Sequence, residues 1–593
     1  MLKQKNIKQI NFKQIFLTAS FILCLSLNLS SNINKEFETL LDEEWEYKIY
    51  QNPVYATSMG VKGLEHFWTD MSAEAINQRK EHYKDLVKRL KKIDEKLLSS
   101  ENQLNYRLFL DLQLNYLELE PFNQHLMPFS HRGGVQLLHE ETEVLLFKSK
   151  DDYKNWLIRL SNLDEYIQQI IKLAQEGLSK GYTKPKILME RVARQITLQC
   201  VEDPEKSPFY KLFIDLPDYL TNEEKKELQN SAKEIISKEI VPSYKELYTF
   251  FINDYLPESR GTFGIYDLPL GKEHYKILAK QFTTTDLSPE EIHQLGLQEV
   301  ERIRKEMNLV MKEVSFEGSF KEFLNFLRED SQFYYNNKED LLEAYLATSK
   351  RADSELVSLF ALLPRTPYGV REIPIESAPD TTTAYYMSPS PDGLRAGYYY
   401  VNLYKPETRP KFEIEVLSLH EAVPGHHLQI SLAMEKESLP MFRRTSPYTA
   451  FVEGWGLYSE SLGYEMGFYK DPYSKFGQLT YDMWRAVRLV VDTGIHYFEW
   501  DRSKAINFFL ENAGKSELDI TNEIDRYINW PGQALAYKVG QLKFLELRAK
   551  AKKELGTRFD IREFHSALLS EGALPLDEAE DLINKFIQDT SDE

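Results

Sequence analysis

Apolar residues recur three and four positions apart along most of the first 260 residues, with lysine and glutamate between them. The pattern is clear in "AEAINQRKEHYKDLVKRLKKIDEKLL" and "NEEKKELQNSAKEIISKEIVPSYKELYTFF", and it predicts long amphipathic helices with solvated charged faces. A further helix is predicted to begin at Ser288, which caps it, with Pro289 in the first turn and Glu291 closing a capping box. The pattern therefore predicts a mainly α-helical protein.

The pattern changes between residues 364 and 412, where proline, glycine and tyrosine dominate. Two runs of β-forming residues, "TTTAYYM" and "AGYYYVNLY", flank the loop "SPSPDGLR" and predict a β-hairpin. Helical periodicity returns at Phe412 and continues almost to the end. No fixed-period repeat or obvious linker divides the chain, so residues 32–593 are expected to form one domain. In it, a helical part, residues 32–262, faces a second part, residues 263–593, across a cleft.

The first 31 residues have the layout of a secretory signal peptide. The apolar run "IFLTASFILCLSLNL" follows four lysines, Lys3, Lys5, Lys8 and Lys13. Cleavage is expected near Ser30 or Ser31, with an uncleaved anchor as the alternative; a lipoprotein modification at Cys24 is disfavoured by the bulky Leu23 before it. Export to the periplasm or the medium is expected, with membrane contact only through this segment. After cleavage Cys200 is the one remaining cysteine, which excludes an intrachain disulfide.

Composition indicates an ordered protein with an acidic surface. The 593 residues are 42% hydrophobic and 13% aromatic, which supplies the apolar material for a large core. The 73 basic and 92 acidic residues give a formal net charge of −19, which repels phosphate backbones and anionic lipid head groups. Nucleic acid is therefore not an expected partner.

The segment "HEAVPGHHLQ", residues 420–429, carries candidate metal ligands. On a regular helix, His420 and His426 would point roughly 120° apart and lie about 9 Å apart along the axis, which excludes a shared metal ion. Pro424 lacks an amide donor and Gly425 tolerates unusual dihedral angles, so this pair can loop out of a helix. Without the pair the string reads "HEAVH", which is the spacing of a zinc-peptidase helix.

On this interpretation His420 and His426 bind zinc, and Glu421 takes a proton from the attacking water. His427 is an additional histidine that supports the site or replaces His426 as the second ligand. A helix break beside two surface histidines is the structural alternative.

A third ligand is expected from "FVEGWGLYSESLG", residues 451–463. Ser446 and Pro447 predict the start of a helix, which places Glu453 in its second turn among apolar side chains. An unpaired carboxylate is costly to bury there, and a metal ion would remove that cost. Glu460 lies seven residues further along the same face, where it either supports the site or reaches solvent.

The segment "QLTYDMWRAVRLVVDTGIHYFEW", residues 478–500, carries a polar stripe on an otherwise apolar helix. The stripe consists of Arg485, Arg488, Asp492 and His496. In the functional interpretation, Asp492 orients His496, which donates a hydrogen bond to the developing oxyanion. Arg485 or Arg488 then receives a substrate carboxylate. A buried ladder that only joins helices is the alternative.

The segment "INWPGQALAYKVGQ", residues 528–541, places Gln533 and Tyr537 four residues apart after a proline-marked helix start. Gln533 is assigned to substrate binding. Tyr537 is a candidate phenolic donor to the scissile carbonyl, with packing in an aromatic-rich chain as the alternative.

The motifs "HEAVPGHHLQ", "FVEGWGLYSE", "RLVVDTGIHYFEW", "WPGQALAYKVG" and "GIYDLPLGKEHYKILAKQFTTTDLSPEEIHQLGLQEV" together resemble the bacterial family of unknown function DUF885. The likeness runs from about residue 40 to the C-terminus. That family is placed among zincin-like metallopeptidases of the glutamate-ligand type, and it is similar to the helical peptidases that include angiotensin-converting enzyme, thimet-type oligopeptidases and carboxypeptidase Taq.

The resemblance implies a large helical zincin-like body with a deep central cleft and a small β-sheet beside the active site. It implies that zinc is held by His420, His426 and Glu453, with Glu421 as the base. It also implies that the strand "AGYYYVNL" lies beside the cleft and pairs with an extended peptide. The Pro-Gly insertion departs from the uninterrupted motif of the relatives, which keeps His427 as an alternative ligand.

The sequence thus predicts an exported zinc metallopeptidase that hydrolyses short peptides, with Zn²⁺ as its cofactor and a peptide as its partner. A zinc hydrolase of another amide or an ester would use the same ligands. A non-catalytic peptide-binding protein on the same fold is a further alternative, although a binder has no need of Glu421 beside a metal ion.

Overall fold

The computed structural model describes residues 12–375, 378–390, 393, 395–445 and 448–592. The protein is mainly helical and has one small β-sheet, as the sequence predicts. The predicted signal segment lies partly outside the described residues. Within the described residues, no helix combines the length and the apolar character that crossing a membrane requires.

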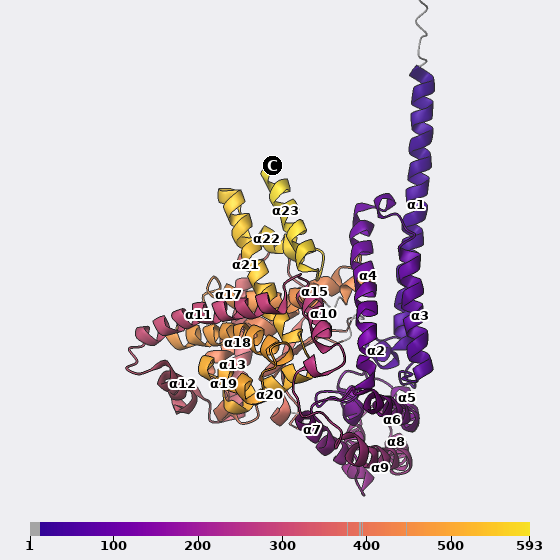
Figure 1. The fold of residues 1–593 in the computed structure, drawn as a ribbon, viewed down its shortest axis with the longest axis vertical. Coiled ribbons are helices and arrows are strands. Elements are labelled where there is room, and N and C mark those ends of the chain that lie inside the picture. The colour runs from indigo at the N-terminus through magenta and orange to yellow at the C-terminus, as the bar shows by residue number, and fades with distance from the viewer. Residues whose placement is uncertain (1–11, 376–377, 391–392, 394, 446–447, 593) are drawn as a thin grey trace, which may run out of the picture.

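From residue 12 onward, where the structure describes the chain, nine α-helices form its first part. They are α1 (Phe12–Gln51), α2 (Pro53–Ser58), α3 (Ala73–Leu90), α4 (Ser100–Leu119), α5 (Lys150–Ser161), α6 (Leu163–Lys180), α7 (Lys186–Thr197), α8 (Asn222–Ile235) and α9 (Val241–Phe250). Helices α1, α3 and α4 run side by side, and the first half of α1 extends away from the other helices (Figure 1). Buried Phe37, Leu86 and Phe109 join these three helices. Helix α1 continues without a break past the predicted cleavage site.

The second part begins with α10 (Gly271–Thr283), α11 (Pro289–Glu313), α12 (Phe320–Glu329) and α13 (Lys338–Glu355). After the sheet it continues with α14 (Ile414–Glu421), α15 (His426–Glu435), α16 (Met441–Arg444), α17 (Thr449–Leu462), α18 (Pro472–His496), α19 (Arg502–Asn512), α20 (Glu517–Asn529), α21 (Ala536–Leu555), α22 (Ile561–Leu569) and α23 (Leu576–Asp592). The predicted start of α11 is confirmed, because Ser288 and Glu291 form a capping box with Pro289 in the first turn.

Helix α18 is the centre of the second part. Every residue from Phe476 to His496 is buried, so this helix is covered on all sides, although it carries charged residues. Helix α11 packs along α18, and α17 packs along α21 (Figure 1). One hydrophobic cluster runs from Leu108 in α4 to Ile587 in α23, so the two predicted parts share a core.

The sheet has three strands in the order β1-β3-β2. Strands β2 (Ala384–Met387) and β3 (Gly397–Val401) pair antiparallel and confirm the predicted hairpin. Strand β1 (Tyr368–Glu372) pairs parallel with β3 and was not predicted. Since β3 lies between two strands, both of its edges are occupied. The expectation that β3 pairs with a peptide is therefore wrong, and β2 is an edge strand.

Candidate metal centre

The Pro-Gly segment separates two helices. Helix α14 ends at Glu421 and α15 begins at His426, so the break spans residues 422–425. Gly425 packs against the end of α14 so closely that a Cβ atom there would lie 1.8 Å from the carbonyl oxygen of His420. The indole Nε1–H of Trp455 in α17 donates a hydrogen bond to the carbonyl oxygen of Pro424 (2.8 Å). The turn is therefore packed on both sides and buried.

The turn brings together the three predicted ligands. Nε2 of His426 lies 3.3 Å from Oε2 of Glu453, and Nε2 of His420 lies 3.7 Å from the same oxygen. The donor atoms of all three residues lie within 4.8 Å of one another. Two donors that each lie about 2.1 Å from a tetrahedral zinc ion are roughly 3.4 Å apart. The donor types and their spacing therefore fit one divalent cation.

Two carboxylates from different turns of helix α17 contact the ring of His420. Glu453 faces Nε2, while Glu460, seven residues later on the same face, accepts a hydrogen bond from Nδ1–H (2.8 Å). Gly456 lies between the two carboxylates, and a Cβ atom there would lie 2.8 Å from the imidazole ring. A carboxylate that accepts from the outer nitrogen of a histidine fixes the ring and leaves the inner nitrogen for a metal ion. Glu460 thus supports the site and does not reach solvent.

His420 and Glu453 each shift the pKa of the other. Burial alone would lower the pKa of His420, but the carboxylates of Glu453 and Glu460 raise it to about 9. Burial alone would raise the pKa of Glu453, but the two histidines hold it well below its usual range. Glu453 is therefore an ionised carboxylate in a buried position, which is the state that a metal ligand needs.

His427 points away from this centre. Its Nε2–H donates to the carbonyl oxygen of Thr366 (3.0 Å), and its Nδ1 accepts from the hydroxyl of Tyr386 (2.8 Å). Burial lowers the pKa of His427 to about 4, so the ring is neutral. Both ring nitrogens have partners, and of the two alternatives the structure brings His426, not His427, to Glu453.

A cavity of about 250 Å³ opens beside the three donors. Glu421 is buried and lines this cavity together with the donors. Tyr537 in α21 also lines it, and its ring lies nearly parallel to that of His420, with the ring centroids 6.5 Å apart. Burial, and then the negative charge of Glu453, raise the pKa of Tyr537, so its hydroxyl stays protonated. The edge strand β2 forms another wall.

The two predicted substrate arginines line the cavity but have protein partners. Nη2 of Arg485 lies 3.3 Å from Oε1 of Glu460. Arg488 donates through Nε to the hydroxyl of Tyr527 (2.7 Å) and through Nη2 to Glu523 (3.1 Å). These contacts hold both guanidinium groups in place.

Gln533 was predicted to bind substrate but does not line this cavity. Its side-chain oxygen accepts a hydrogen bond from Nη1 of Arg526 (2.7 Å). Arg526 and Arg132 do line the cavity, and the sequence interpretation missed both. Arg526 shares one helix face with Glu523, three residues earlier, and such a pair on α20 was the available signal. Arg132 lies in a loop and carried no signal.

The prediction for His496 is corrected by the structure. The ring is fully buried, its Nδ1 accepts from the backbone N–H of Ile265 (3.1 Å), and its Nε2–H donates to the carbonyl oxygen of Tyr527 (3.0 Å). Because both nitrogens are occupied and the residue does not line the described cavity, His496 is not placed to donate to a substrate. It joins α18 to α20.

The prediction for Asp492 is also corrected. Its Oδ1 accepts from the hydroxyl of Tyr275 (2.5 Å) and from the backbone N–H of Gly532 (3.0 Å), rather than from His496. Burial raises the pKa of Asp492 to about 7, and the two hydrogen bonds oppose this only in part. Asp492 is therefore a buried structural carboxyl group.

Replacing Asp492 with Asn should change the pH dependence of stability. The folded carboxyl group keeps its proton to about pH 7, whereas the unfolded group loses it near its ordinary pKa of 3.8. The group therefore stabilises the fold most at low pH, and this contribution falls as the pH rises from about 4 to about 7. Denaturant unfolding should show Asp492→Asn gaining stability relative to the native protein over this range, by roughly 2 kcal/mol or more. The exposed control Asp254→Asn should show the same dependence of unfolding free energy on pH as the native protein. If the profiles of Asp492→Asn, Asp254→Asn and the native protein are parallel, the raised pKa of Asp492 is wrong.

Together, the fold and the site define a mainly helical protein with a candidate metal centre of two histidines and one glutamate. The chain matches the family described as "Bacterial protein of unknown function (DUF885)" over residues 53–583, and it belongs to that family.

Two solved structures are similar to this chain. The crystal structure of "the putative lipoprotein from Colwellia psychrerythraea" has a TM-score of 0.89 at 30% sequence identity, and the match covers 94% of this chain and 99% of that chain. The structure of "a putative lipoprotein of unknown function from Shewanella oneidensis" has a TM-score of 0.71 at 18% sequence identity, and the match covers 92% of this chain and 99% of that chain. At this identity the match shows a likeness of fold alone. No curated protein matches the chain significantly.

Proposed function

We propose that this protein is an exported zinc-dependent metallopeptidase that hydrolyses short peptides. One observation carries the proposal: the donors of His420, His426 and Glu453 converge within 4.8 Å, and Glu421 lines the same cavity. Two imidazoles and one carboxylate with an open position are the ligand set of catalytic zinc sites. A bound zinc ion supplies Lewis acidity, which polarises a carbonyl group and makes water more acidic.

We assign the general base and the oxyanion donor to side chains around the three metal donors. Glu421 follows His420 directly and lines the cavity, so we assign it the role of taking a proton from the attacking water and passing it to the leaving amine. Of the two predicted donors, His496 and Tyr537, only Tyr537 lines the cavity, and its hydroxyl stays protonated. It is the donor that we assign to the developing oxyanion.

Strand β2 supports a peptide as the substrate. It contributes Ala384, Tyr385 and Tyr386 to the cavity wall, and β3 pairs with only one of its edges. An extended peptide can add to such an edge through backbone hydrogen bonds that do not depend on its sequence. The cavity beside the donors has a volume of about 250 Å³, which favours an unfolded segment over a folded protein.

Two observations support export. The basic and then apolar N-terminal segment has the layout of a signal peptide. The similar protein from Colwellia psychrerythraea is described as a "putative lipoprotein", and lipoproteins are an exported class.

Removing the metal tests this proposal. Dialysis against a zinc chelator should abolish hydrolysis of a mixed library of short peptides, and one equivalent of zinc should restore it. The chelated protein should also melt at a lower temperature, because zinc binds only the folded ligand set. Mass spectrometry of the library identifies peptide products. If the protein cleaves only other amides or esters, the proposed peptidase is wrong and the protein is a different zinc hydrolase. If it binds zinc but turns over no substrate, it is a binding protein.

A further inference from the structure

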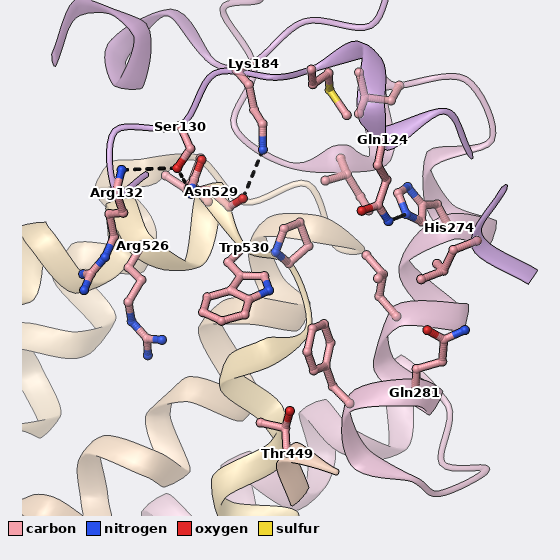
Figure 2. Close-up of a pocket in the computed structure, with 18 of the residues that line it drawn as sticks. Gln124, Ser130, Arg132, Lys184, His274, Gln281, Thr449, Arg526, Asn529 and Trp530 are labelled. Carbon is pink, nitrogen blue, oxygen red and sulfur yellow. Dashed lines mark hydrogen bonds between the residues drawn. The ribbon is translucent and has the colours of Figure 1, made fainter. Parts of the chain in front are cut away.

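A second and larger cavity adjoins the metal centre. It has a volume of about 790 Å³, compared with about 250 Å³ beside the three donors. Its walls come from α4, α10, the end of α20 and the loops that carry Arg132, Lys184 and Arg260. Figure 2 shows side chains that line it. The size lies in the range of cavities that bind small ligands or several residues of a peptide.

The charged residues that line this cavity are all basic. Among its described lining residues there are four basic side chains, Arg132, Lys184, Arg260 and Arg526, and no aspartate or glutamate. The chain as a whole carries a formal net charge of −19. A wall with cations alone is therefore opposite in sign to the rest of the molecule, and the low-dielectric surroundings concentrate its positive potential.

Three of these cations lack a carboxylate partner. Nζ of Lys184 donates to the carbonyl oxygen of Asn529 (3.2 Å), and Nε of Arg260 donates to that of Thr183 (2.9 Å). Within the described part of the chain, no ion pair joins Lys184, Arg260 or Arg132 to a carboxylate. By contrast, Arg526 pairs with Glu523 at 3.3 Å. Three of the four cations therefore have no carboxylate within ion-pair distance in the described residues.

The surroundings make these unpaired charges costly. Burial, and then the positive charge of Arg260, lower the pKa of Lys184 to about 8. Burial lowers the pKa of Arg260 to about 10. A desolvated cation without an anion is unfavourable, and an anionic ligand would relieve that cost on binding.

The larger cavity and the cavity at the metal centre share two arginines. Arg132 and Arg526 line both cavities. Figure 2 shows these two side chains next to each other at one side of the larger cavity, and it shows Lys184 extending toward Asn529. A chain that extends from the donors into the larger cavity would pass the two guanidinium groups first and then reach Lys184.

We propose that the larger cavity binds the carboxylate-bearing part of the peptide whose neighbouring bond lies at the metal centre. This substrate class rests on the proposed peptidase function and narrows it. The carboxylate belongs either to a free C-terminus or to an aspartate or glutamate side chain. The apolar side chains of Leu112, Met127, Leu278 and Trp530 in the same walls receive the non-polar atoms of that segment.

Binding to the Glu421→Gln protein tests this inference without turnover. Calorimetry or tryptophan fluorescence would compare peptide pairs that differ in one carboxylate: glutamate against glutamine within the peptide, and C-terminal acid against C-terminal amide. We expect the acid of at least one pair to bind about tenfold tighter at low salt, since an ionised acceptor strengthens hydrogen bonds from buried cations. The pair that shows the preference identifies the source of the carboxylate.

Matched lysine variants locate the effect. Lys184→Gln, added to Glu421→Gln, should reduce the acid preference by about fivefold or more, whereas Lys312→Gln on the exposed surface should leave it unchanged. Thermal melting checks that each variant is folded. If Lys184→Gln does not fold, Arg132→Gln replaces it, because Arg132 lies in a loop and is not part of the buried core.

The outcomes separate this inference from the proposed function. Equal binding of acidic and neutral peptides, or an acid preference that neither Lys184→Gln nor Arg132→Gln reduces, would overturn the inference. Peptide cleavage by the native protein would still support a peptidase in that case. Tight binding of inorganic phosphate without any acid preference among peptides would also overturn it. Acid preference without cleavage by the zinc-loaded protein would refute the peptidase and keep the cavity as a carboxylate site.

Discussion

Replacing His426 with Ala should abolish stoichiometric zinc binding, whereas the same change at the adjacent His427 should leave it intact. Nε2 of His426 lies 3.3 Å from Oε2 of Glu453, so its loss removes one of three protein donors. His427 instead joins Thr366 and Tyr386 through its two nitrogens. Loss of a zinc ligand typically weakens binding far more than the ten- to hundredfold effect of a supporting residue. Metal analysis of the purified proteins after dialysis measures this difference directly.

The two variants control for each other, because they make the same change at neighbouring positions in the first turn of α15. Circular dichroism and thermal melting in zinc-free buffer should show that both variants are folded. Loss of zinc in His427→Ala with retention in His426→Ala would reverse the ligand assignment. It would also show that the turn at Pro424 does not bring His420 and His426 to the same metal ion.

Replacing Glu421 with Gln should lower peptide turnover by about 100-fold or more while zinc stays bound. The side chain lines the cavity beside the three donors, and no other described acid in that wall follows a ligand directly. Glutamine has nearly the same shape but cannot take a proton from water. The loss should therefore fall on kcat, with little change in the affinity for a substrate or for the metal.

Glu415→Gln is the matched control, because Glu415 lies on the same helix but accepts a hydrogen bond from the backbone N–H of Tyr469 (2.9 Å) and does not line the cavity. Its turnover should remain close to that of the native protein. Native-like kcat in Glu421→Gln, measured with zinc stoichiometry confirmed, would remove the base assignment.

The sequence predicts most of the metal centre because the information is local. His420 and His426 occur within one short segment, and the proline and glycine between them mark the break that lets both side chains face one point. Glu453 could be inferred because a carboxylate among apolar residues needs a partner. The helices and the β2–β3 hairpin follow from periodicity in the same way.

The polar stripe on α18 shows where such local reasoning fails. Its spacing places Arg488, Asp492 and His496 on one face, but the identity of their partners depends on α10, α20 and the loop at Ile265. Those elements are far away in the sequence. A buried histidine with two backbone partners and a catalytic histidine have the same local pattern, so only the packing separates them.

The sheet and the larger cavity were unpredictable for the same reason. Strand β1 is short and half-buried, so its pattern is weak, yet its pairing with β3 decides that β2 is the free edge. Arg132, Lys184 and Arg260 lie in separate loops and elements, and each alone reads as an ordinary surface cation. Only the fold gathers them into one wall without acids.

A crystal structure of the zinc-loaded protein, with anomalous diffraction measured at the zinc absorption edge, tests the metal centre directly. We expect one strong peak between Nε2 of His420, Nε2 of His426 and the carboxylate of Glu453, at about 2.0–2.2 Å from each donor, with Glu421 facing the open side. A peak bound to His427, or no peak among these three side chains, would contradict this expectation.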